Sequence, residues 1–188
     1  DPARDLVVDG GRCGVGVEST IVDATSARPR ILRTGAIAEA DLAAVLGPAP
    51  GRSPALAGSG APDVRAPGTL ASHYAPAAVV TAVEPAALPT LAAVVGPLPA
   101  GGVGLLAPAG VVTPRGWLRL AEPTDSAEYA HVLYGSLRLA DRLGLARVVA
   151  VLPDPQSGPL AAAVRDRLAR AAHPDRGQPD RGRPGGVG

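Results

Sequence analysis

The stretch from Gly47 to Pro76 is the feature that most limits how this chain can fold. It reads GPAPGRSPALAGSGAPDVRAPGTLASHYAP, so proline and glycine recur at short intervals and interrupt any regular apolar pattern. Proline lacks a backbone N–H donor, and glycine loses the most conformational freedom on ordering. Such a segment is too broken to form a core, and we expect a linker over residues 48–76. The chain should therefore divide into a part before the linker and a part after it.

Before the linker, the sequence predicts short strands followed by one helix. Runs rich in valine and isoleucine predict strands over residues 5–9, 18–23 and 30–33. A helix is expected over residues 39–46, with an apolar side that includes Val45 and Leu46. Residues 1–47 therefore look like the closing edge of an α/β sheet whose other strands would lie upstream.

After the linker, strands alternate with helices, which is typical of a three-layer domain around a mostly parallel sheet. Strands are expected over residues 78–83, 103–106, 117–120 and 147–152, and a first helix near 88–95. Asp125, followed three residues later by Glu128, has the pattern of a capping box for a helix that ends near Gly144. We expect residues 77–172 to form this domain.

The last helix of the domain is predicted from its apolar spacing. Ser157 is expected to cap it. Its buried face should carry Leu160, Val164 and Leu168, while Arg165, Arg167 and Arg170 fall outside that face. The residues that follow, 173–188, are rich in proline, glycine and charge, and we expect a disordered tail.

The composition excludes several classes of protein. The 188 residues carry a net charge of +1, which gives no electrostatic reason to expect direct nucleic-acid binding, and no apolar run is long enough to span a membrane. Cys13 is the single cysteine, so an internal disulfide is excluded, which suits a cytoplasmic location. All 18 basic residues are arginine. Because the chain begins without methionine, we expect an N-terminal part to precede it.

Five polar or aromatic residues are candidates for a functional site, although each has an ordinary structural alternative. Ser19 and Thr20 precede a strand, where hydroxyl groups often bond neighbouring backbone; facing a cleft, they would bind a small polar substrate. Arg33 ends the next strand, and its planar guanidinium suits a phosphate or a carboxylate unless it is a solvated strand end. His73 and Tyr74 follow in the linker, where they either pack or contact a ligand.

Other chemistry finds no support in the sequence. It contains neither a phosphate-binding loop nor the glycine fingerprint of dinucleotide-binding domains, and the GGVG run at 101–104 reads as a turn. The three histidines, His73, His131 and His173, are too scattered to suggest a metal site. Spacing alone identifies no catalytic residue.

Four segments occur in an order that points to one family. GVESTIVD at residues 16–23, ILRTGAI at 31–37 and APGTLASHYAP at 66–76 precede an α/β domain that ends in the helix GPLAAAVRDRLARAA. In this combination the chain resembles the two-domain form of threonylcarbamoyl-AMP synthase, of the YrdC-type family. The resemblance implies that residues 1–47 are the C-terminal edge of an open, twisted α/β sheet. It also implies that a small Rossmann-like three-layer domain follows the linker.

Enzymes of this family condense L-threonine, bicarbonate and ATP into threonylcarbamoyl-AMP and pyrophosphate, the first step of N6-threonylcarbamoyladenosine formation on tRNA. A partner transferase then modifies the tRNA. By motif match, the resemblance implies that Ser19 contacts L-threonine and that Arg33 and Tyr74 bind ATP, with Mg²⁺ accompanying the nucleotide. Thr20 and His73 are weaker candidates beside them. A linker folded over the cavity would shield the labile carbamate from water.

One departure from the family changes what we expect of this chain alone. The family's catalytic domain carries a lysine in its substrate-binding cluster, whereas this chain has no lysine, so we expect it to lack synthase activity by itself. The alternative from another class is a non-catalytic binding or regulatory module built from residues 78–172. The protein segment encoded upstream in the same reading frame would separate the two.

Overall fold

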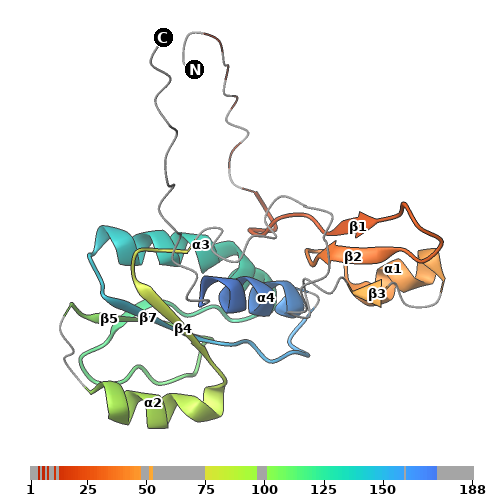
Figure 1. Cartoon of the computed structure of the whole chain (residues 1–188). Helices are drawn as coiled ribbons and strands as arrows, with labels where there is room; N and C mark the ends of the chain where they lie inside the picture. The colour runs from red at the N-terminus through yellow and green to blue at the C-terminus, as the bar shows by residue number, and fades with distance from the viewer. Residues whose placement is uncertain are drawn as a thin grey trace, which may run out of the picture.

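The structure is a computed structural model. It describes residues 13–47, 51–52, 75–96, 101–158 and 160–172, together with Arg4, Leu6, Val8 and Gly11. Of the candidate site residues, Ser19, Thr20 and Arg33 are therefore described, whereas His73 and Tyr74 lie outside the described residues. The predicted tail, 173–188, lies outside them too. Figure 1 shows a small sheet on one side of α4 and a larger, parallel sheet below it.

The small sheet has three strands. β1 (Ile21–Asp23) pairs antiparallel with β2 (Arg30–Arg33), and β3 (Gly51–Arg52) pairs parallel with β2 on its other side. The strand predicted over residues 30–33 is confirmed, and the one predicted over 18–23 is confirmed for its last three residues. We refer to β1, β2 and the turn between them as the hairpin.

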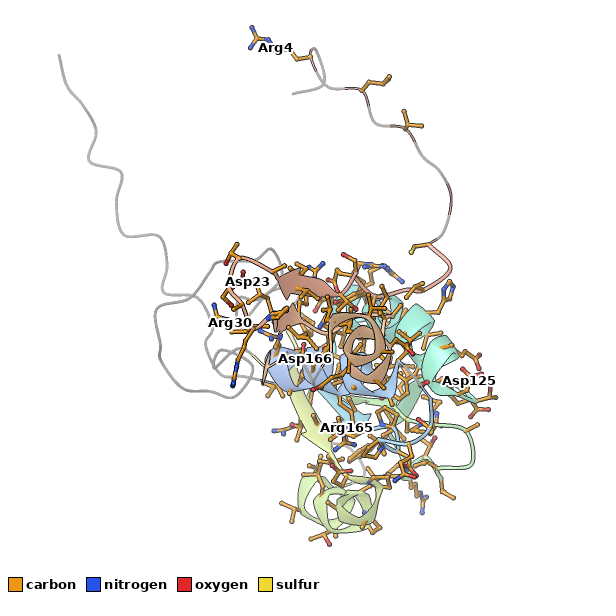
Figure 2. The ribbon with its side chains drawn as sticks, turned by 90° about the vertical axis from the view of Figure 1, so that its right-hand side faces the viewer. Arg4, Asp23, Arg30, Asp125, Arg165 and Asp166 are labelled. Atoms are coloured by element: carbon orange, nitrogen blue, oxygen red, sulfur yellow. The ribbon has the colours of Figure 1, made fainter. Side chains whose placement is uncertain are left out.

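An acidic side chain closes the turn of the hairpin. The Asp23 carboxylate accepts hydrogen bonds from the backbone N–H and the hydroxyl of Thr25 at 3.0 and 2.6 Å, and it pairs with Arg30 at 2.9 Å. Figure 2 shows Asp23 and Arg30 at neighbouring positions on the hairpin. The bonds from Thr25 and from Arg30 favour the charged carboxylate and lower the pKa of Asp23 to about 2.

Two details of this first part were not predicted. β3 lies within residues 48–76, so the expected linker contributes a short strand, which pairs with the edge that β2 leaves open. The strand expected over residues 5–9 is wrong at Leu6 and Val8, which lie in no strand and are 88% and 81% exposed. Among the described strands, none pairs with these two residues, and an isolated strand cannot satisfy its backbone hydrogen bonds.

The helix predicted before the linker is confirmed as α1 (Glu39–Leu46). Its expected apolar side is not buried against the described residues, because Val45 and Leu46 are 84% and 40% exposed. The helix is instead favoured locally, by residues of high helix propensity and by Glu39 and Asp41 in its first turn, where the helix dipole attracts negative charge.

The second part is a four-stranded sheet in which neighbouring strands all run parallel. Its strands are β4 (Val79–Val83), β5 (Val103–Leu106), β6 (Leu118–Ala121) and β7 (Arg147–Val151). They are arranged in the order β4-β7-β5-β6, and the short 3₁₀ helix η2 (Pro85–Ala87) follows β4. The prediction of a mostly parallel sheet is confirmed. We call residues 75–172 the parallel-sheet unit.

Helices cover both faces of this sheet and complete three layers (Figure 1). α2 (Leu88–Val95) packs on one face, whereas α3 (Ser126–Arg142) and α4 (Ala161–Ala171) pack against each other on the opposite face. Successive side chains of β7 point to opposite faces of the sheet, so Val149 packs in the core beneath α2 and Ala150 packs in the core beneath α3 and α4. The predicted α/β architecture of this unit is therefore confirmed.

The N-terminus of α3 begins at the residue that the sequence predicts. The Asp125 carboxylate accepts from the backbone N–H groups of Ala127 and Glu128 at 2.9 and 2.8 Å. The second half of the expected capping box is wrong. The Glu128 carboxylate accepts instead from the backbone N–H and the hydroxyl of Thr124, at 2.8 and 2.7 Å. Thr124 offers these two donors, whereas Asp125 offers only its backbone N–H.

The last helix differs from its prediction in two ways. Ser157 does not cap α4; its hydroxyl donates to the Asp154 carbonyl oxygen at 2.7 Å in the turn after β7, and the helix starts only after Leu160. The predicted apolar face is confirmed as buried. Arg167, which falls outside that face, is nevertheless buried too, with 6% of its surface exposed.

Candidate functional site

The structure brings two of the predicted site residues into direct contact. Arg33, at the end of β2, reaches across to Ser19, which stands shortly before β1. Its guanidinium donates to the Ser19 carbonyl oxygen at 3.0 Å and to the Ser19 hydroxyl oxygen at 3.2 Å. Arg33 is buried and Ser19 is exposed. Because the hydroxyl oxygen accepts from Arg33, its own proton is left to donate outward.

Thr20, the neighbouring candidate, has a structural role in this arrangement. Its hydroxyl donates to the Ile37 carbonyl oxygen at 3.1 Å and accepts from the Ile37 N–H at 3.2 Å. Gly35 lies against the same backbone, since a Cβ atom there would stand 2.3 Å from the backbone nitrogen of Thr20. The ESTIVD and ILRTGAI segments are thus bound together side by side, and a part for Thr20 in substrate binding stays a prediction.

The residue before Ser19 is held by two helices of the parallel-sheet unit. The Glu18 carboxylate accepts from Nε of Arg167 on α4 at 2.9 Å and from the hydroxyl of Tyr134 on α3 at 2.9 Å. Burial raises the pKa of Glu18, but the hydrogen bond and charge of Arg167, together with hydrogen bonds from the backbone and from Tyr134, outweigh it, so the pKa lies below its usual range. Burial, together with the same carboxylate, raises the pKa of Tyr134.

Arg167 also binds the residue that follows β2. Its terminal nitrogen donates to the carbonyl oxygen of Thr34 at 2.8 Å. Glu18 directly precedes Ser19, and Thr34 directly follows Arg33, so one guanidinium holds both neighbours of the predicted site pair. This role of Arg167 was not predictable from the sequence, because an arginine outside an apolar helix face normally lies in water.

The chain before Glu18 packs on α3. Val17 is 7% exposed and belongs to the same buried core as Leu133 of α3. Gly16 lies directly on the helix backbone, where a Cβ atom would stand 2.3 Å from the Cα atom of His131. We call residues 16–34, which contain the hairpin, the hairpin segment; through Val17 it shares a hydrophobic core with the parallel-sheet unit.

A cavity in the parallel-sheet unit is a second candidate for a ligand site, at the carboxyl ends of the strands, where open α/β sheets bind ligands. Its volume is about 230 Å³. The second residue after each strand is a proline that lines this cavity: Pro85, Pro108, Pro123 and Pro153. Proline has no N–H, so these four positions offer none of the donors that hold phosphate groups in nucleotide-binding sheets. The N-terminus of α3, beside the cavity, is already satisfied by the Asp125 carboxylate.

The described residues form no metal-binding cluster, and the two linker candidates lie outside them. In the part of the chain that the structure describes, no three His, Cys, Asp or Glu side chains gather to hold a metal ion. The expected contacts of His73 and Tyr74 with ATP fall outside the described residues and stay predictions.

Comparison with known proteins agrees with the resemblance seen in the sequence. A profile of the family described as "threonylcarbamoyl-AMP synthase, C-terminal domain" matches residues 37–173. The chain belongs to this family. The matched range covers α1, residues 48–76 and the parallel-sheet unit, and it begins just after the segment that contains Ser19 and Arg33.

Individual relatives match parts of the chain. The threonylcarbamoyl-AMP synthase of Pyrococcus abyssi is 38% identical over 80 residues, which are 43% of this chain and 23% of that protein. The crystal structure of P. abyssi Sua5 complexed with L-threonine matches with a TM-score of 0.69 and 28% identity, over 87% of this chain and 48% of that chain. A Sua5 variant with a histidine and the next tyrosine replaced by alanine matches with the same TM-score and identity, over 47% of its length. The chain thus spans about half the length of these solved relatives.

Proposed function

We propose that this chain serves the synthesis of threonylcarbamoyl-AMP from L-threonine, bicarbonate and ATP, with release of pyrophosphate. This nucleotidyl transfer is the first step of N6-threonylcarbamoyladenosine formation on tRNA. The observation that carries the proposal is the contact between Ser19 and Arg33, in a chain of this family with a relative crystallised with L-threonine. The contact joins a hydroxyl donor and a cation at one place, which suits substrates that carry carboxylate and phosphate groups.

Ser19 is the proposed contact for L-threonine. Its exposed hydroxyl has a proton to donate because its oxygen accepts from Arg33 at 3.2 Å. The positive charge behind the hydroxyl makes it a stronger donor to the threonine carboxylate. Thr20 is the weaker candidate next to it, because its hydroxyl already donates to the carbonyl oxygen of Ile37 and accepts from the N–H of the same residue.

Arg33 and the linker are the proposed contacts for ATP. In the reaction, the threonine nitrogen bonds to the carbon of bicarbonate with loss of water, and the resulting carbamate oxygen displaces pyrophosphate from the α-phosphorus. Both steps gather negative charge, which the Arg33 guanidinium would stabilise beside Ser19. The chain has a single His-Tyr dipeptide, His73-Tyr74, and the pair replaced in the Sua5 variant is also His-Tyr. We assign Tyr74 to the nucleotide, His73 as its weaker companion, and Mg²⁺ to the phosphate oxygens of the bound ATP.

The product would pass to a threonylcarbamoyl transferase, so the proposal requires no direct nucleic-acid contact by this chain. We accordingly propose that the reaction takes place in the cytoplasm. Within the described ranges, no helix combines the length and the apolar character that crossing a membrane requires.

Pyrophosphate release tests the proposal, measured on this chain and on the full-length protein in which it occurs. The full-length protein should release pyrophosphate only when L-threonine, bicarbonate and ATP are all present, whereas the chain alone, without any lysine, should be inactive. Ser19→Ala should lower kcat/KM for L-threonine about tenfold, through the loss of one charge-assisted hydrogen bond. Ser26→Ala, in the exposed hairpin turn, is the matched control. An inactive full-length protein would favour a non-catalytic module instead.

A further inference from the structure

We propose that Arg167, from the last helix of the parallel-sheet unit, is a positioning residue that fixes the Ser19–Arg33 pair. This inference rests on the proposed function and assigns the parallel-sheet unit a task in it. Arg167 approaches neither substrate contact directly. It acts through Glu18 and Thr34, the residues next to them in the sequence.

Each of the three nitrogens of the Arg167 guanidinium has a hydrogen-bond or ion-pair partner. Nε donates to Glu18 at 2.9 Å, one terminal nitrogen donates to the Thr34 carbonyl oxygen at 2.8 Å, and the other pairs with Asp166 at 2.6 Å. A planar guanidinium that is bonded through all three of its nitrogens is held in one orientation. The hairpin is therefore bound to α4 in one register.

The place of these contacts is what makes them relevant to the site. Glu18 lies on the β1 side and Thr34 on the β2 side, at the point where Arg33 crosses to Ser19. Consecutive residues of an extended chain are about 3.3 Å apart and share a rigid peptide plane, so a shift of Glu18 or Thr34 moves its neighbour as well. One displaced guanidinium would therefore alter both halves of the site pair.

Burial separates this contact from an ordinary surface ion pair. The Arg167 side chain is 5% exposed and that of Glu18 is 22% exposed, and Tyr134 donates to the same carboxylate from α3. Exposed ion pairs contribute little, whereas removal of one partner from a buried pair leaves a charge without compensation. Val17 adds apolar contact beside the pair. The hairpin is thus positioned by charge and by packing together.

The first test separates substrate affinity from turnover in the full-length protein. Arg167→Met should raise KM for L-threonine about tenfold, because small displacements of binding groups weaken substrate positioning. Arg165→Met is the matched control, since this arginine of the same helix pairs with Glu84 and donates to the Pro153 carbonyl oxygen, both within the parallel-sheet unit. Its KM should stay within about twofold of the parent value. Equal kinetics for the two variants, in an active parent, would overturn the inference.

The second test does not depend on activity. Hydrogen exchange of the backbone amides around Ser19 and Arg33 should speed up in Arg167→Met by about tenfold or more and stay unchanged in Arg165→Met. Tyr134→Phe provides a milder variant, which keeps the packing and removes one bond to Glu18. A parent protein that releases no pyrophosphate contradicts the proposed function alone. Unchanged exchange in Arg167→Met and Tyr134→Phe contradicts the positioning role.

Discussion

Nε of Arg167 lies 2.9 Å from Oε2 of Glu18, although 149 positions separate the two residues in the chain. The contact joins the residues before β1 to α4, and so brings α4 next to the Ser19–Arg33 pair. Only 5% of the Arg167 side chain is exposed. The stability of the hairpin and the geometry of the proposed site therefore depend on the same ion pair.

Neutralising one partner of this pair should destabilise the fold. Glu18→Gln retains the side-chain shape but removes one of the two carboxylates that pair with the buried Arg167 charge, so that only Asp166 remains among the described carboxylates. We expect a loss of about 1–3 kcal/mol in the free energy of unfolding, below the full cost for a wholly buried pair because Glu18 is 22% exposed. Chemical denaturation of Glu18→Gln, Arg167→Met and the double variant would measure the coupling. A coupling energy near zero would show that the pair adds nothing to stability.

The hairpin turn should remain stable to unusually low pH. Its Asp23 has a pKa of about 2 in the folded chain, against 3.8 for an unperturbed aspartate. A carboxylate with a depressed folded pKa adds stability above its unfolded value, and this stability is lost as the pH falls from about 4 to about 2. An NMR titration of the carboxyl carbon should therefore find a midpoint well below 3.8. Thr25→Val, which removes the side-chain hydrogen bond, should raise this midpoint; an unchanged midpoint would contradict the assignment.

Most elements of the fold could be predicted from the sequence because their causes are local. α1 and the strands of the parallel-sheet unit follow short patterns of apolar residues between glycine, proline and charged residues. The errors also have local causes. Ser157 resembles a helix cap, but its hydroxyl donates to the Asp154 carbonyl oxygen, and α4 starts only after Leu160.

The candidate site was predictable only in part. Ser19 and Arg33 lie in recognisable motifs, and pairing of β1 with β2 is enough to bring them together. The contact of Arg167 with Glu18 arises from packing between distant segments, and no periodicity within α4 distinguishes a buried arginine from a solvated one. Its burial follows from the position of the hairpin segment on α3 and α4.

Removal of the Asp125 N-cap of α3 should lower the free energy of unfolding by an amount typical of helix caps. Asp125→Ala removes the acceptor of two backbone N–H groups, and we expect the free energy of unfolding to fall by about 1 kcal/mol. Asp125→Asn keeps an acceptor oxygen in the same position and should lose clearly less. Urea denaturation of the two variants would make the comparison. Equal losses would mean that the charge of Asp125, rather than its hydrogen bonds, stabilises the helix.

Filling the cavity at the carboxyl ends of the parallel strands should leave ATP binding unchanged. Val111 lines this cavity, whereas the next residue, Val112, is 82% exposed, so Val111→Trp and Val112→Trp form a matched pair. Neither should alter the affinity of the full-length protein for ATP. Arg33→Ala and Tyr74→Ala should weaken that affinity about tenfold or more, as expected for loss of a charged or stacking contact with the nucleotide. A loss of ATP binding in Val111→Trp alone would instead place the nucleotide in the parallel-sheet unit.

Two glycines provide a measure of how tightly the hairpin segment is docked. Gly16 and Gly110 have φ angles of 76° and 83°, so an alanine at either position pays a similar cost of about 1–2 kcal/mol for left-handed backbone. At Gly110, no described atom lies within 4 Å of the added Cβ, whereas at Gly16 it would stand 2.3 Å from the Cα atom of His131. That atom belongs to the backbone of α3 and cannot rotate aside.

We therefore expect Gly16→Ala to lose at least about 1–3 kcal/mol more stability than Gly110→Ala, the range typical of overpacking. The excess measures the cost of moving the hairpin segment away from α3. Because Glu18 follows two residues after Gly16, the same variant should weaken the contact with Arg167, and Glu18→Gln should then cost less in the Gly16→Ala background than in the parent. Equal losses for the two alanine variants would mean that the segment is not docked on α3, and the ion pair alone would have to hold the hairpin.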